Sequence, residues 1–186
     1  MMIKHVGADQ YLCPDFPTTT AALRDGRMVT IRPLGARDTR AEVAFLRALS
    51  PTARRNRLLG QSLTPDASVA EDLFDADGVS RLVLGGFVGD QLCGVTQYGV
   101  DGPDRTCCEI ATVVDGAFDD TGLAEALLEQ LIHLAKARGI HHMYALELAE
   151  NQEAARLLHW FGFKADAVPD DATLTRFCRP TDTIAP

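Results

Sequence analysis

The sequence has no apolar run near the 18 or more residues that would span a bilayer. It also has no excess of basic charge, since 18 basic and 26 acidic side chains give a net charge of −8. Such a chain repels phosphate backbones, which argues against nucleic acid as a partner. The first residues hold one lysine and no apolar stretch, so no secretory signal is expected there. We therefore predict a cytoplasmic protein that binds neither membrane nor nucleic acid.

Paired cysteines and metal-ligand spacings are also missing. The chain has five cysteines, and none forms a Cys-x-x-Cys pair. His141 and His142 are adjacent, so on a strand they would point to opposite faces. The sequence therefore predicts free thiols and no metal site.

What is present is typical of one globular domain. The chain has 186 residues, of which 46% are hydrophobic and 24% charged. Residues 1–26 include two prolines and a run of three threonines with little periodicity, which predicts a loosely ordered arm. We expect a single domain over 27–180, with no linker dividing it, and a short tail over 181–186.

Within 27–180 the hydrophobic pattern alternates between strand and helix periods. Strands are expected over 28–32, 81–88, 92–100, 107–114, 142–148, 163–167 and 173–178. Helices are expected from Asp38 as a cap to about 49, from Pro51, over 68–74, over 122–138 and from Asn151 to before Gly162. This order predicts a mixed α/β domain with one parallel crossover around the long helix over 122–138.

The most informative stretch runs from Glu109 to Ala124, where a strand leads through a short loop into that long helix. Free backbone N–H groups and the positive end of the helix dipole meet at such a turn, which favours binding of a phosphate. Gly122 would let a ligand approach the backbone closely.

Three segments in this order resemble one known family. They are Met28–Pro33 as an opening strand, Glu109–Asp115 followed by Gly122-Leu123-Ala124 and a leucine-rich helix, and Asn151-x-x-Ala154-x-x-Leu157 closed by Gly162-Phe163. Together they resemble the GNAT superfamily of acyl-CoA-dependent N-acyltransferases. A weaker similarity, in the helix after Ser50 with Arg54, Arg55 and Arg57, is to the GNAT domains of bacterial protein-lysine acetyltransferases.

The resemblance implies a fold class and a reaction. The fold would be α/β of the α+β type, with a mostly antiparallel twisted sheet flanked by helices. Its one parallel pair, the strands over 109–114 and 142–148, would splay apart. The activity would be N-acyl transfer, most simply N-acetyl transfer, from acetyl-CoA directly to the amine of a small molecule or a protein lysine.

The resemblance also implies roles for particular residues. Glu109 matches the position of a general base, which must take a proton from the acceptor ammonium before the amine attacks. The cofactor-binding positions would be Val113 and Val114 for the pantetheine arm, Thr121, Gly122, Leu123 and Ala124 for the pyrophosphate, and Asn151 for the pantetheine or a bound water.

The loop before the long helix departs from the family pattern. It reads Asp119-Asp120-Thr121, where relatives commonly carry Gln or Arg first and a basic residue just before the glycine. Because two carboxylates repel a pyrophosphate, weak acetyl-CoA binding is expected, and the aspartates would instead cap the helix. An alternative function is therefore a catalytically degenerate GNAT domain that senses a ligand or binds a protein. A homodimer is compatible with either function.

Overall fold

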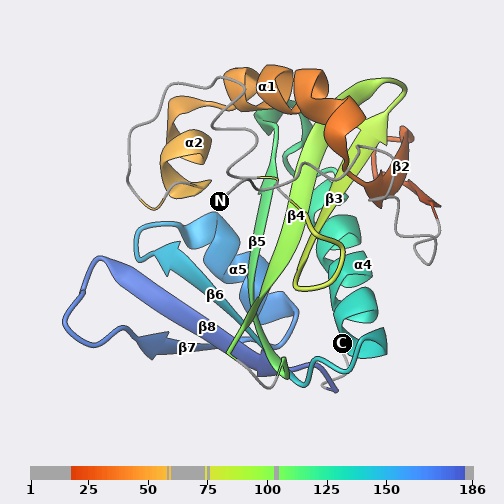
Figure 1. Ribbon diagram of the computed structural model, residues 1–186. Helices are drawn as coiled ribbons and strands as arrows, with labels where there is room; N and C mark the ends of the chain where they lie inside the picture. The colour runs from red at the N-terminus through yellow and green to blue at the C-terminus, as the bar shows by residue number, and fades with distance from the viewer. Residues whose placement is uncertain (1–17, 58, 60–73, 75, 103–104, 183–186) are drawn as a thin grey trace, which may run out of the picture.

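The structure is a computed structural model that describes residues 18–57, 59, 74, 76–102 and 105–182. Eight strands form one sheet in the order β1-β2-β3-β4-β5-β6-β8-β7, and only β5 and β6 pair in parallel. The strands are β1 (Thr19–Ala22), β2 (Met28–Pro33), β3 (Arg81–Val88), β4 (Gln91–Asp101), β5 (Cys107–Val114), β6 (His142–Leu148), β7 (Lys164–Ala167) and β8 (Leu174–Pro180). The helices are α1 (Thr39–Ala48), α2 (Pro51–Arg57), α4 (Leu123–Ala137) and α5 (Gln152–Trp160), with 3₁₀ turns η1 (Ala36–Asp38) and η2 (Gly116–Phe118). This mixed, mostly antiparallel architecture confirms the predicted fold class (Figure 1).

The long helix α4 is the centre of the larger core. Its leucines Leu123, Leu127, Leu128 and Leu131 are fully buried against β3, β4 and β5. Gly139 follows the helix with a φ of 77°, the left-handed conformation that ends many helices. A second cluster, which includes Phe45, Leu46 and Leu49 of α1, packs on the other face of the sheet. None of the described helices is long and apolar enough to cross a membrane.

Most predicted elements lie close to their predicted bounds, with two exceptions at the ends of the domain. Thr19–Ala22, which were assigned to a loose arm, pair with β2 as an edge strand. Thr181, assigned to the tail, is buried and its hydroxyl donates to the Ile140 carbonyl at 2.6 Å. The strand β1 was missed although its partner β2 follows after a short connection, because Thr-Thr-Ala-Ala lacks the alternation of polar and apolar residues that marks a strand. Thr181 was missed because its partner, Ile140, lies 41 positions earlier in the sequence. The helix predicted over 68–74 lies outside the described residues except for Phe74.

Asp38 also differs from its predicted role as the cap of α1. Its carboxylate forms no capping bond to that helix. It instead accepts two hydrogen bonds from the Arg32 guanidinium, at 2.8 and 2.7 Å, and one from the Gly35 N–H at 3.0 Å. The Asp38 carboxylate therefore accepts hydrogen bonds from Arg32 and from the 3₁₀ turn, and not from the N–H groups of α1 as the sequence pattern predicted.

The contact between α4 and the sheet depends on Gly94 in β4. A Cβ atom there would lie 2.8 Å from Leu127 Cδ1 and 2.9 Å from Val114 Cγ1. Gly94→Ala is expected to lower the free energy of unfolding by about 1–3 kcal/mol, because overpacking forces neighbours from their rotamers. Gly99→Ala is the matched control, since nothing lies within 4 Å of its Cβ position. Urea unfolding of both variants checks this, and equal stability of the two would contradict it.

Candidate active site

The parallel strands β5 and β6 separate soon after they begin to pair. Their register runs Cys107–His142, Cys108–Met143 and Glu109–Tyr144, and no pair follows although both strands continue, to Val114 and Leu148. The divergence predicted for these strands is therefore confirmed (Figure 1). In the described part of the chain, no strand lies next to β5 on this edge beyond Glu109.

The pairing of β5 with β4 decides which backbone groups face this gap. The Asp115 N–H donates to the Cys93 carbonyl, so these two residues form a hydrogen-bonded pair of the antiparallel ladder. Such pairs alternate with pairs whose N–H and C=O groups point the other way. Val113 therefore directs its backbone toward β4, whereas Thr112 and Val114 direct theirs toward the gap. Of the two predicted pantetheine contacts, Val114 has the suitable orientation and Val113 does not.

Glu109 lies at the point where the strands part. Its side chain is exposed, and the Tyr144 hydroxyl lies 3.5 Å from its Oε2. The same hydroxyl donates to Asp101 Oδ2 at 3.2 Å. Burial, together with the negative charges of Glu109 and Asp101, raises the pKa of Tyr144. Tyr144 therefore keeps its proton and acts as a donor between two carboxylates.

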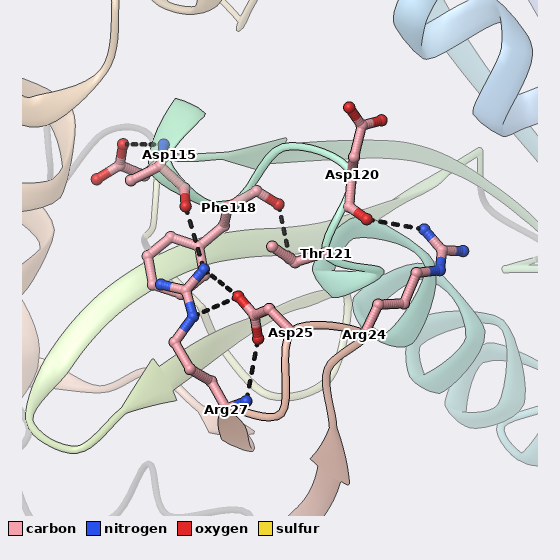
Figure 2. A network of polar contacts seen from close by, with 8 residues as sticks. Arg24, Asp25, Arg27, Asp115, Phe118, Asp120 and Thr121 are labelled. Atoms are coloured by element: carbon pink, nitrogen blue, oxygen red, sulfur yellow. Dashed lines mark hydrogen bonds and ion pairs between the residues drawn. The ribbon is translucent and has the colours of Figure 1, made fainter.

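Arg24, which precedes β2, supplies a cation to the loop before α4. Its Nη1 donates to the Asp120 carbonyl at 3.2 Å (Figure 2). Its Nη2 pairs with Glu125 Oε1 at 2.9 Å. Its guanidinium carbon lies 3.6 Å from where a Gly122 Cβ would be. Gly122 has a φ of 87°, and its missing side chain leaves room for this contact. The missing basic residue of the loop is therefore replaced from another segment, which sequence spacing could not reveal.

The two loop aspartates do not cap α4, contrary to prediction. The N-cap position belongs to Gly122, and no side chain makes a capping bond there. Asp120 has a φ of 58°, and its carboxylate points away from Arg24 (Figure 2). Burial, with the negative charges of Asp120 and Asp115, raises the pKa of Asp119. Neither carboxylate therefore bonds to the N–H groups of the first turn of the helix, whose N-cap is the left-handed Gly122.

The other residues predicted to hold the pyrophosphate differ in what they can offer. Thr121 is buried, and both its N–H and its hydroxyl donate to the Phe118 carbonyl, at 3.3 and 2.6 Å (Figure 2). Leu123 is fully buried, so only its backbone can meet a ligand. The N–H groups of the first turn of α4, from Leu123 and Ala124, have no partner within the helix. The backbone at Gly122–Ala124 can therefore bind an anion, but the Thr121 side chain cannot.

Asn151 connects α5 to a carboxylate that the sequence analysis did not select. Its Oδ1 accepts from the Ala154 N–H at 3.3 Å and so caps α5, while its Nδ2 donates to Glu147 Oε2 at 2.8 Å. Burial raises the pKa of Glu147 to about 7, although Asn151 and the positive charge of Arg57 lower it. Glu147 lies on β6 beyond the last pair with β5, so a second carboxylate belongs to the splayed region.

The three arginines of α2, which carry the weaker similarity to protein-lysine acetyltransferases, make different contacts. Arg54 donates to the Leu49 carbonyl at 3.1 Å and so closes the end of α1. Arg55 pairs with Glu150. Burial lowers the pKa of Arg57 to about 10, and its Nη2 has no hydrogen-bond partner among the described residues. The helix therefore brings positive charge to the splayed strands, within electrostatic range of Glu147 and Glu109.

These features fit a thioester carrying an extended arm and phosphates. The free edge of β5 offers backbone donors and acceptors, and the start of α4 with Arg24 offers N–H groups and a cation. Among the described residues, no group of three or more His, Cys, Asp or Glu side chains is placed to hold a metal ion. The site therefore has the layout of an acyltransferase that uses an acyl-CoA thioester.

Comparison with known proteins agrees with this layout. The model of the acetyltransferase (GNAT) family matches residues 45–163. The chain is 30% identical over 156 residues to acetyltransferase PA5475 of Pseudomonas aeruginosa, which covers 82% of this chain and 83% of that protein. The protein belongs to the GNAT acetyltransferase family.

Solved structures show the same fold at lower identity. The GNAT domain of Streptomyces lividans PAT superposes with a TM-score of 0.82 at 22% identity, covering 89% of this chain and 99% of that domain. The acetyltransferase yncA of Salmonella typhimurium, solved with acetyl-CoA, has a TM-score of 0.64 at 24% identity, covering 85% and 96%. Both similarities show the fold alone.

Proposed function

We propose that this protein transfers the acetyl group of acetyl-CoA to a primary amine by direct transfer, as a cytoplasmic N-acetyltransferase. The observation that carries the proposal is the parallel pair that ends at Glu109–Tyr144 beside the loop held by Arg24. Family membership and the acetyl-CoA complex of yncA support the choice of donor. A homodimer stays a prediction from the sequence.

Each part of the site has a role in this proposal. When bound, acetyl-CoA supplies a thioester whose acetyl group passes to the amine nitrogen with release of the CoA thiol. Glu109 accepts the proton that the acceptor ammonium must lose before its lone pair is available. Val114 binds the pantetheine arm through its backbone, and Gly122–Ala124 with Arg24 hold the pyrophosphate. Asn151 acts through Glu147 and the start of α5 rather than as a direct contact.

A second candidate is a GNAT domain that binds a ligand or partner without catalysis. The observation that favours it is the pair of loop carboxylates, Asp119 and Asp120, close to the proposed pyrophosphate site. Their negative charge opposes a phosphate even though neither carboxylate bonds to the start of the helix. Calorimetric titration with acetyl-CoA, followed by an assay of thiol release with a panel of amines, separates the two functions. Binding without turnover of any amine would favour the second.

Arg24→Gln is expected to weaken acetyl-CoA binding by about 3–10-fold, because an exposed charge contributes about 1 kcal/mol to such a contact. The effect should shrink at high salt, where screening is stronger. Arg37→Gln is the matched control, an exposed arginine of η1 whose Nε lies 4.0 Å from Asp38 Oδ2. Calorimetry at low and high salt measures both. If only Arg37→Gln weakened binding, Arg24 would not hold the phosphates.

A further inference from the structure

A cavity of about 340 Å³ lies on β6, β8 and β7, next to the paired part of β5 and β6 that ends at Glu109 and Tyr144. Its lining includes Cys107, Tyr144, Lys164, Asp166, Arg176 and Cys178. The Tyr144 hydroxyl, which lies 3.5 Å from Glu109 Oε2, links this cavity to the proposed catalytic carboxylate. A molecule whose amine reaches Glu109 therefore has an adjoining space for the rest of its structure.

Strand register places these residues on one face of the sheet. Glu109 pairs with Tyr144, Tyr144 with Cys178, and Cys178 with Lys164. Side chains directly opposite each other on neighbouring strands share a face. Arg176 lies two residues from Cys178 and so shares it too. Glu109 and Arg176 are two strands apart and offset by two residues along the strand, so their backbones are separated by about 12 Å.

The two ends of this face carry opposite charge. Asp101 and Glu109 flank the Tyr144 hydroxyl. The charged residues that line the cavity are Lys164, Arg176, Arg179 and Asp166, an excess of positive charge. Neither Lys164 nor Arg176 makes an ion pair within the described part of the chain, and the Arg176 guanidinium lies over the Tyr144 ring at 4.3 Å. The cavity thus offers two cations without an ion pair to any described residue, Lys164 and the Arg176 guanidinium that stacks on Tyr144, with Asp166 opposite Arg176 on β7.

We propose that this cavity binds the acceptor and selects a small primary amine that carries a carboxylate several bonds from its nitrogen. The ammonium lies between Glu109 and Asp101, the connecting chain crosses Tyr144, and the carboxylate meets Lys164 and Arg176. This inference rests on the proposed acetyl transfer. It assigns specificity to residues of β7 and β8, outside the segments that carry the resemblance to the family.

The test compares two acceptors that differ only in charge, Nα-acetyl-lysine and Nα-acetyl-lysinamide. The wild-type protein should acetylate the carboxylate with a kcat/KM at least tenfold higher. Lys164→Gln should raise KM for the carboxylate about tenfold, leave kcat unchanged, and leave the amide unaffected. Arg176→Gln should act similarly, but Lys164→Gln is the cleaner variant because Arg176 also stacks on Tyr144. Lys136→Gln is the control, an exposed lysine on α4 that pairs with Asp182.

Binding gives a second readout that does not need turnover. Nα-acetyl-lysine titrated into the CoA-saturated protein should release heat with the wild type and with Lys136→Gln, and far less with Lys164→Gln. Equal turnover of the two acceptors, or an unchanged preference in Lys164→Gln, would overturn the inference. So would acetylation of protein lysines in preference to both compounds. Absence of acetyl-CoA binding would instead refute the proposed function itself, so the two failures are distinguishable.

Discussion

Glu109→Gln is expected to lower kcat by about 10²–10⁴-fold while leaving the Kd for acetyl-CoA nearly unchanged. The acceptor is an ammonium ion at neutral pH, and its nitrogen has no lone pair until a base removes a proton. Gln keeps the size of the side chain and loses the basic oxygen. Because Glu109 lies on the exposed side of β5, its replacement should leave the fold and the free β5 edge intact. Steady-state kinetics with calorimetry of acetyl-CoA binding separates the two effects.

Asp101→Asn is the matched control, because Asp101 accepts from the same Tyr144 hydroxyl but lies one strand further from the gap. Replacing Asp101 by Asn should change KM for the acceptor more than kcat.

Glu147→Gln provides the opposing test, since Glu147 is the second carboxylate of the splayed region. Full activity in Glu109→Gln with loss of activity in Glu147→Gln would show that the proton passes to β6 instead.

Local patterns in the sequence predicted the elements that build this site. The leucine spacing from Leu123 gave the long helix, and the apolar alternation of β5 gave its bounds of Cys107–Val114, as the structure has them. The separation of β5 from β6 could not come from periodicity. It was implied by the family resemblance, which rests on the segments around Glu109 and Asn151 and on the order of these segments along the chain.

The parts of the site that were missed depend on contacts between distant segments. Arg24 lies 98 positions before Gly122 and reaches it only because β1 and β2 extend the sheet beside α4. The capping role expected of Asp119 and Asp120 failed because the N-cap is Gly122, and the backbone at Asp120 and Gly122 is left-handed. Residue type at a helix start indicates a cap only where the backbone adopts the usual extended entry.

Glu147 was missed for a different reason, since a carboxylate between Leu146 and Leu148 could equally be a solvated strand position. Its burial follows from the packing of α2 and the start of α5 around the end of β6, which supply Arg57 and Asn151. The available signal was the spacing Glu147-x-x-x-Asn151, which places an amide donor four residues from a carboxylate across a turn. That signal is weak without the three-dimensional contacts.

The buried Glu147 should make stability depend on pH. Its pKa rises from 4.5 to about 7 on folding, chiefly through burial, so the folded state favours the protonated form. Between these values the folded protein binds more protons than the unfolded chain, and stability must fall as pH rises. Above pH 7 both states are ionised at this group and the loss is complete. Its size is on the order of 2–3 kcal/mol, allowing for partial screening by solvent.

Glu147→Gln removes this titration and keeps an acceptor for Asn151. Relative to the wild type, the variant should therefore gain about 2–3 kcal/mol in the free energy of unfolding between pH 4.5 and pH 8. Taking the difference between the two proteins cancels the titration of other carboxylates. Glu150→Gln, at an exposed position paired with Arg55, should give a difference that hardly changes with pH. Urea unfolding across this range provides the measurement. A difference in the free energy of unfolding between Glu147→Gln and the wild type that does not change with pH would contradict this. It would mean that water reaches the carboxylate and that Arg57 and Asn151 offset its burial. Glu147 would then be ionised at neutral pH in the folded protein.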